Sequence, residues 1–244
     1  MITQIKSILN TENMPDEEVN SELAYRLYAG YLKELPEQYV EKLHENGITP
    51  VSQFLTRENG KLLWTLNLLG EEAEAVIKPV IMEKEVYCIP HEVCVENRSI
   101  TTVNDVDTLF AMASVSKKHR LEFATATAFK SQGQYTNLPT LALCIKSLVR
   151  KWNASFPEAL IDDEDQEGID QIINGLFCPR YRIHDCKYTL KGKCIYGFRG
   201  ELTIKNSLTG FQKELADMLL LFSQYSGTGI KTTLGMGGVI HSFV

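Results

Sequence analysis

Residues 211–244 read FQKELADMLLLFSQYSGTGIKTTLGMGGVIHSFV, and they place a glycine-rich loop between two contrasting segments. Before the loop, apolar residues recur with the spacing of one helix face: Phe211, Leu215, Met218, Leu219 and Phe222. After it, apolar residues up to Val244 indicate a buried strand. The loop, residues 227–238, has five glycines in twelve positions, three threonines and Lys231. Backbone N–H groups and a cation in such a loop suit the binding of phosphate.

Three interpretations of this loop compete. A flexible tail conflicts with the apolar residues that follow the loop. A nucleotide-binding P-loop requires Gly where Ile230 stands, and it requires a strand before the loop and a helix after it, which is the reverse of the order here. The dinucleotide pattern G-x-G-x-x-G fails because Thr232 replaces its third Gly. We therefore interpret the loop as one that binds a polynucleotide backbone.

The segments before the loop follow an order that occurs twice in the chain. The second half contains, in order, a β-rich run at 119–129, helical patterns at 141–152 and 168–177, and a hairpin of 181–190 and 194–204. The first half contains, in order, a strand at 2–10, two short helices, a hairpin of 51–55 and 61–68, a helix at about 70–82 and an extended segment at 85–95.

This repeated order is β-α-β-β-α-β, with the first helix of each half divided in two. It predicts an α+β protein of two tandem ferredoxin-like (RRM-like) domains with antiparallel sheets. We place the domains at 1–115 and 116–244. The sheet faces of such domains commonly bind RNA.

Charge is distributed unevenly between the two halves. The chain has 244 residues and a net charge of −6, which argues against a polyanion partner when the chain is taken whole. Residues 1–115 have 9 Lys and Arg against 19 Asp and Glu, whereas residues 116–244 have 16 against 12. The basic second half is therefore the predicted polyanion-binding half.

Other features of the composition exclude several classes of protein. The N-terminus lacks the apolar run of a signal peptide, and no stretch is long and apolar enough to span a membrane. The six cysteines do not have the density of a disulfide scaffold, so we expect a cytoplasmic location and no membrane partner. Cys88, His91 and Cys94 have the chemistry of metal ligands. Positions three apart on a strand point to opposite faces, however, so these three side chains would not converge on one metal ion.

Four segments carry a resemblance to one known family. Residues 225–237 resemble its glycine-rich loop, and 124–129 (ATATAF) resemble its Thr-Pro-Thr-x-Phe strand, with Ala126 where Pro is usual. Residues 197–202 (GFRGEL) resemble the strand before its final helix, and 43–47 (LHENG) resemble its Leu-His-x-x-Gly. The chain is thus similar to the CRISPR-associated endoribonucleases that cut precursor CRISPR RNA within its repeats, the sixth Cas family of the repeat-associated mysterious protein superfamily.

The resemblance implies a reaction that needs no metal and no cofactor. The ribose 2′-OH attacks the adjacent phosphate and leaves a 2′,3′-cyclic phosphate and a 5′-OH. This chemistry requires a base, an acid and cations near the phosphorane charge. The residue that matches the family's catalytic His is His44. A His near a helix C-terminus is well placed to carry positive charge, although it can also simply cap carbonyl groups.

The resemblance also implies a Tyr from the preceding helix and a Lys shortly after the His. We expect Tyr28 to be the catalytic Tyr, with Tyr31 as the alternative, and both could instead belong to the core. The Lys is missing, because residues 48–51 read ITPV, so Lys130 or Lys231 would have to supply the cation. The RNA-binding residues that we predict are Lys130, Arg180, Arg182, Gly227, Gly229, Lys231, Thr232, Gly235 and Gly237.

The expected partner is CRISPR repeat RNA. An inactive RNA-binding subunit of an interference complex is the alternative function, since the superfamily also supplies scaffold proteins. Association with other Cas proteins and formation of a homodimer remain open at this point, as do the repeat sequence and the position of the cut.

Overall fold

The computed structural model describes residues 1–12, 14, 21–45, 47–89, 91–114, 116, 118–162 and 167–244. Asn46 of the Leu-His segment and Val115 at the predicted domain boundary lie outside this set. In the part of the chain that is described, no helix is both long and apolar enough to cross a lipid bilayer.

The first half forms an antiparallel five-stranded sheet in the order β2-β3-β1-β5-β4. Its elements are β1 (Ile2–Asn10), α1 (Ser21–Leu32), α2 (Glu37–Glu45), β2 (Val51–Glu58), β3 (Lys61–Leu69), α3 (Glu71–Glu83), β4 (Val86–Cys88), β5 (Glu92–Val103) and α4 (Val106–Ala113). The extended segment expected at 85–95 is a hairpin of β4 and β5.

The second half forms an antiparallel four-stranded sheet in the order β11-β6-β10-β9. Its elements are β6 (Lys118–Thr127), β7 (Phe129–Ser131), β8 (Gln134–Thr136), α5 (Leu141–Ser155), the 3-10 turn η2 (Pro157–Ala159), α6 (Glu167–Gly175), β9 (Leu176–Leu190), β10 (Lys193–Asn206), α7 (Gly210–Ser226), the 3-10 turn η3 (Thr232–Leu234) and β11 (Val239–Phe243). In the first sheet β1 lies between β3 and β5, and in the second sheet β6 lies between β10 and β11. The first strand of each half thus lies between the third and the last strands of that half, as the β-α-β-β-α-β order requires. The predicted fold class is confirmed.

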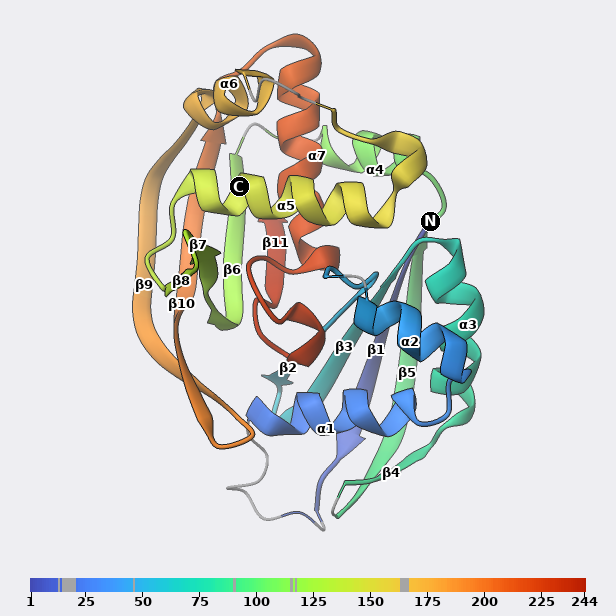
Figure 1. The fold of residues 1–244 in the computed structure, drawn as a ribbon. Helices are drawn as coiled ribbons and strands as arrows, with labels where there is room; N and C mark the ends of the chain where they lie inside the picture. The colour runs from blue at the N-terminus through green and yellow to red at the C-terminus, as the bar shows by residue number, and fades with distance from the viewer. Residues whose placement is uncertain are drawn as a thin grey trace.

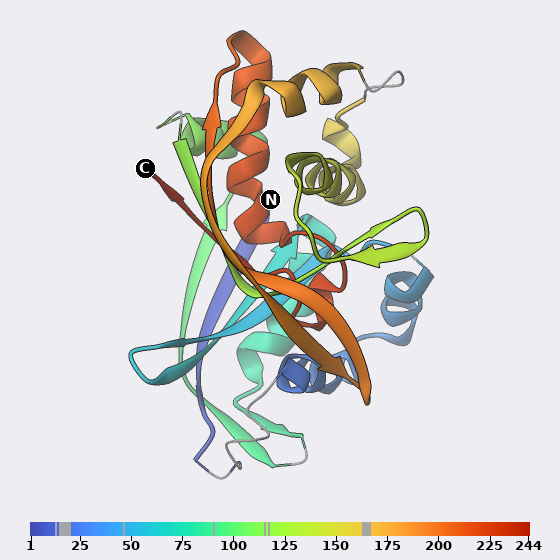
Figure 2. The ribbon, with the colours of Figure 1, turned by 90° about the vertical axis from the view of Figure 1, so that its left-hand side faces the viewer.

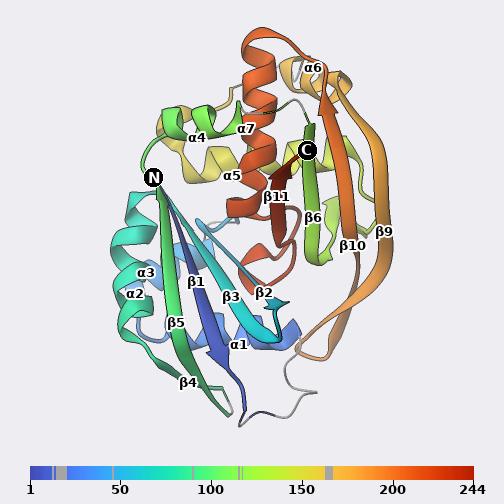
Figure 3. The ribbon, with the colours of Figure 1, turned by 180° about the vertical axis from the view of Figure 1, so that it is seen from behind.

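The two sheets lie side by side, and helices cover one side of both (Figures 1 and 3). One apolar core fills the first half between its sheet and α1, α2 and α3. The core of the second half also takes in Ile2, Leu69 and Val103 from the first sheet, and it includes Leu109 of α4. Residues from both halves therefore share this core, and the domain boundary between 115 and 116 stays a prediction.

Buried polar side chains of β2 and β3 connect the first sheet to the glycine-rich loop. Gln53 Nε2 donates to the carbonyl oxygens of Ala24 (2.8 Å) and Thr233 (2.6 Å), and Trp64 Nε1 donates to Gln53 Oε1 (2.7 Å). Ser52 Oγ donates to the carbonyl oxygen of Tyr225 at the end of α7 (2.5 Å). These bonds fix the loop against the first half of the chain.

Candidate functional site

A cleft of about 820 Å³ opens between α1, α2, α5 and the glycine-rich loop. Figure 1 shows the loop in red between α5 above and α1 below. The cleft is lined by residues from segments far apart in sequence. They include Tyr25 and Tyr28 of α1, Lys33 directly after it, Leu43 and His44 of α2, Lys130 of β7, Tyr135 of β8, Ser147, Arg150 and Lys151 of α5, Lys191, and residues 229–234. Both halves of the chain build it.

The charge of this cleft has a single sign. Its lining includes six Lys and Arg side chains, which are Lys33, Lys130, Arg150, Lys151, Lys191 and Lys231. Among the residues that the structure describes, no Asp or Glu lines it. In a chain with a net charge of −6, such a cleft electrostatically favours an anion.

His44 lies in the last turn of α2, at one wall of the cleft. The neighbouring Leu43 is 4% exposed and anchors the end of the helix in the core, whereas His44 is exposed. His44 makes no hydrogen bond to any of the described residues. Both of its ring nitrogens are therefore available to a bound molecule.

The two candidate tyrosines are in different places. Tyr28 lines the cleft, whereas Tyr31 is fully buried, and the two rings meet edge to face with centroids 5.4 Å apart. Burial raises the pKa of the Tyr28 phenol above its ordinary value. Tyr28 therefore keeps its proton at neutral pH, and its hydroxyl can donate a hydrogen bond to a ligand in the cleft.

The glycine-rich loop is held by backbone contacts with residues 124–128. Ile230 N and Gly237 N donate to the carbonyl oxygens of Ala128 and Ala126, each at 2.9 Å. Cβ atoms at Gly229 and Gly237 would overlap carbonyl oxygens, and both glycines have positive φ, +83° and +66°. Several of these glycines are therefore required because another stretch of backbone lies against them.

This arrangement divides the predicted RNA-binding residues of the loop into residues that line the cleft and residues that are buried. Gly229, Lys231 and Thr232 line the cleft. Gly227, Gly235 and Gly237 are buried, and Gly235 lies against Ala24 of α1. A role in RNA binding stays a prediction for all of them.

Lys130 lines the cleft, but Arg180 and Arg182 do not. These two arginines are exposed on β9, the outer strand of the second sheet (Figure 3). In the antiparallel register they lie opposite Thr203 and Glu201 of β10. The structure thus brings His44, Tyr28, Lys130 and Lys231 into one cleft and leaves Arg180 and Arg182 on a separate surface.

Lys151 is a site residue that the sequence analysis missed. Its Nζ donates to Thr232 Oγ1 (2.6 Å) and to the carbonyl oxygen of Ser226 (3.1 Å), so it joins the end of α7 to the loop. Burial, with a smaller effect from Arg150, lowers the pKa of Lys151 to about 7. The sequence signal was a Lys between the apolar residues Leu148 and Trp152 of one helix face.

Comparison with known proteins agrees with the sequence resemblance. Residues 121–239 match the family model of the CRISPR-associated endoribonuclease Cas6. A Cas6 from Streptococcus thermophilus is 28% identical over 227 residues, which cover 89% of this chain and 90% of that protein. The chain is similar to Cas6 endoribonucleases along most of its length.

Other relatives and solved Cas6 structures extend this agreement. A Mycobacterium tuberculosis Cas6 is 26% identical over 228 residues, covering 89% of this chain and 71% of that protein. The Thermus thermophilus Cas6 structure matches with a TM-score of 0.71 at 20% identity, covering 99% of this chain and 98% of that one. A solved Cas6 product complex matches with a TM-score of 0.77 at 20% identity, covering 99% and 100%. These structures share the fold of this chain.

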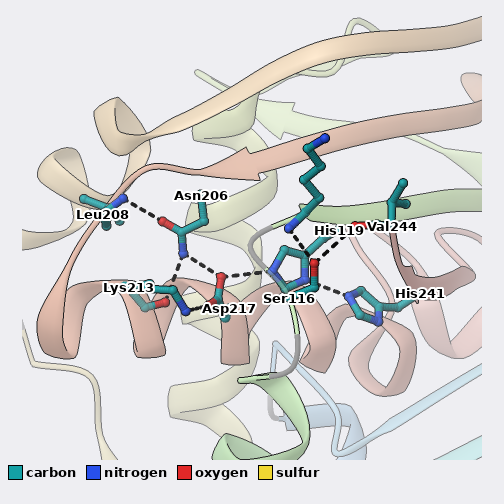
Figure 4. Close-up of polar contacts among 9 residues, drawn as sticks. Ser116, His119, Asn206, Leu208, Lys213, Asp217, His241 and Val244 are labelled. Atoms are coloured by element: carbon teal, nitrogen blue, oxygen red, sulfur yellow. Dashed lines mark hydrogen bonds and ion pairs between the residues drawn. The ribbon is translucent and has the colours of Figure 1, made fainter.

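A second polar cluster in this chain lies outside the cleft, and it joins β6, β11 and α7 (Figure 4). His119 Nε2 donates to Asp217 Oδ1 (2.9 Å), and His119 Nδ1 lies 2.9 Å from His241 Nε2. Burial opposes ionisation of Asp217, but hydrogen bonds from His119, Lys213 and Asn206 hold the pKa of this carboxyl below its ordinary value. In the described part of the chain, no group of three His, Cys, Asp or Glu side chains is arranged to hold a metal ion.

We expect His241 to make stability depend on pH. Burial, together with the neighbouring His119, lowers its pKa to about 4, although Asp217 acts in the opposite direction. Between about pH 6.5 and 4 the unfolded chain therefore binds a proton that the folded protein does not, so acidification lowers the free energy of unfolding. Urea unfolding across this range should show a loss on the order of 2 kcal/mol that His241→Gln reduces.

The matched control for this prediction is His184→Gln, because His184 is exposed on β9, away from the cluster. The free energy of unfolding of His184→Gln should depend on pH as that of the wild type does. If His241→Gln leaves the slope between pH 6.5 and 4 unchanged, the assignment of the acid sensitivity to this cluster is wrong.

Proposed function

We propose that this protein is an endoribonuclease that cuts precursor CRISPR RNA within its repeats without a metal ion. In the reaction the ribose 2′-OH loses its proton and attacks the adjacent phosphorus, and the bond to the 5′-oxygen breaks. The 5′-oxygen takes up a proton, so the products carry a 2′,3′-cyclic phosphate and a 5′-OH. The observation that carries the proposal is a cleft that is lined by six Lys and Arg residues and also holds the exposed His44, which has no hydrogen-bond partner among the described residues.

Each requirement of this reaction has a candidate in the cleft. His44 can transfer protons, because imidazole is the commonest general acid or base in enzymes and no described residue bonds to its ring nitrogens. Tyr28 can donate a hydrogen bond to a phosphate oxygen. Lys130 and Lys231 line the same cleft and can offset the charge that develops on the phosphorane, in place of the missing Lys after the Leu-His segment.

The composition of the cleft also supports a reaction without a resident metal ion. Mg²⁺ is bound in proteins mainly through carboxylate and other oxygen ligands. The described lining of the cleft offers no carboxylate, and its positive charge disfavours a divalent cation. Fixed Lys and Arg side chains supply the compensation for phosphate charge instead.

The test uses an RNA that carries one repeat of the host's own CRISPR array. The wild type should cut it at one position in excess EDTA, and end analysis should show a 2′,3′-cyclic phosphate and a 5′-OH. Replacing the 2′-OH at the cut position by hydrogen should abolish cutting and leave binding intact. Tight binding of the natural RNA without cutting would contradict the proposal and favour the alternative, an inactive RNA-binding subunit.

We expect the cleft cations to govern the salt dependence of RNA binding. The double variant Lys130→Ala, Lys231→Ala should bind more weakly and reduce the slope of log affinity against log salt by about 1.4, which is roughly 0.7 for each phosphate contact on a single strand. Filter binding between low and moderate salt measures this slope.

The matched control is Lys6→Ala, Lys61→Ala, since both lysines are exposed on the first sheet outside the cleft. It removes the same amount of charge and should change the slope little. A third pair, Arg180→Ala, Arg182→Ala, shows whether RNA also reaches β9. Equal slopes for the cleft variant and its control would place the RNA elsewhere.

A further inference from the structure

The short hairpin of β7 and β8 carries an aromatic residue into the cleft. Tyr135 lines the cleft and is 57% exposed. In the antiparallel register it lies opposite Lys130, so the two side chains share one face of the hairpin. Figure 2 shows the hairpin projecting on the side of the molecule that carries α2 and α5.

The hairpin is anchored at its base. Phe129 is 3% exposed and stacks on Phe198 of β10, with ring centroids 6.3 Å apart. Gln132 and Gly133 both have positive φ, 49° and 80°, which is the signature of a tight hairpin turn. Beyond β8, Asn137 Nδ2 donates to Asp185 Oδ1 of β9 (3.1 Å). The ring of Tyr135 is therefore held on a defined support.

Three tyrosines line the cleft, and the ring of Tyr135 is the most open of them. Tyr25 has the Lys191 ammonium over its ring, 4.6 Å from the centroid. Tyr28 is only 7% exposed and packs on Tyr31. An open aromatic face beside cations is the combination that binds single-stranded nucleic acid, because the cation holds the phosphate and the ring stacks on the base.

We propose that Tyr135 is a stacking site for one unpaired nucleobase next to the bond that is cut. This inference rests on the proposed function, and it adds a constraint on the substrate. Base faces inside a duplex are covered by their neighbours, so the RNA must present at least one unstacked nucleotide at the cleft. Lys130, on the same face of the hairpin, binds the phosphate of that nucleotide.

The experiment couples a protein variant with a change in the RNA. Repeat RNAs with a 2′-hydrogen at the cut position are made with a single abasic nucleotide, placed in turn at each position near the cut. Binding of each RNA is measured for the wild type, Tyr135→Ala and Tyr135→Trp. Tyr196→Ala is the control, since Tyr196 is 61% exposed on β10 outside the cleft.

At one abasic position the wild type should lose roughly 10- to 100-fold in affinity. Tyr135→Ala should lose a similar amount of affinity for the intact RNA. The abasic change at that same position should weaken its binding little further, because the stacking partner is already absent. Tyr135→Trp should retain the affinity and the abasic effect. Tyr196→Ala should behave as the wild type.

Additive effects at every position would overturn the stacking proposal, and so would unchanged binding by Tyr135→Ala. The failure of the proposed cleavage is a separate result: the wild type would bind natural repeat RNA and not cut it. The coupling measured with uncleavable RNA would then still decide whether Tyr135 stacks on a base.

Discussion

His44→Ala is expected to slow the cutting of repeat RNA by about 100- to 10,000-fold, the range over which a positioned general acid or base contributes. The change should lower kcat and leave RNA affinity within a few-fold, because the exposed Lys and Arg side chains of the cleft remain to hold the phosphates. Single-turnover cleavage in EDTA, with enzyme in excess over labelled RNA, measures the chemical step.

A loss of folding should not account for the loss of activity in His44→Ala. His44 is exposed, and its neighbour Leu43 provides the packing at the end of α2, so the variant should unfold at the wild-type urea concentration. His184→Ala is the matched control, being an exposed His outside the cleft. Cutting by His44→Ala at the wild-type rate would remove His44 from the reaction.

Gly237→Ala is expected to cost about 2 to 5 kcal/mol of stability. The added Cβ would overlap the carbonyl oxygen of Thr228, and φ is +66°, a region that L-residues rarely adopt. The estimate combines about 1 to 3 kcal/mol for overpacking with roughly 1 to 2 kcal/mol for the backbone conformation. Urea unfolding measures the loss.

Gly192→Ala separates these two contributions. Gly192 has a similar φ of +72°, but a Cβ there would meet nothing within 4 Å. It should therefore lose only the conformational part, about 1 to 2 kcal/mol. If the two variants lose the same amount, the close approach of Thr228 to Gly237 does not explain why glycine is needed at this position.

The order of strands and helices was predictable because most elements are long and strongly periodic. The apolar face of α7 and the alternation of β6 and β10 left little ambiguity. The β7–β8 hairpin was missed because each of its strands has only three residues. The helix α4 was missed although Asp105 caps it, accepting from Thr108 N.

The candidate site was predictable only in part. His44, Tyr28 and the glycine-rich loop could be chosen because the family resemblance singled them out. Arg150 and Lys151 could not, because their place in the cleft depends on how α5 packs against the loop. The burial of Gly227, Gly235 and Gly237 was also invisible, since the same glycine pattern suits either close packing of backbone or access by a ligand.

The contrast between a cationic cleft and an acidic chain also has a kinetic consequence. With a net charge of −6, and with five Lys and Arg side chains besides the buried Lys151 gathered in the cleft, the remaining residues are more acidic than the whole. An approaching RNA is attracted most strongly where the cleft cations lie, so encounters are oriented before contact. We expect fast, salt-sensitive association at the cleft, and little time lost to unproductive complexes elsewhere on the protein.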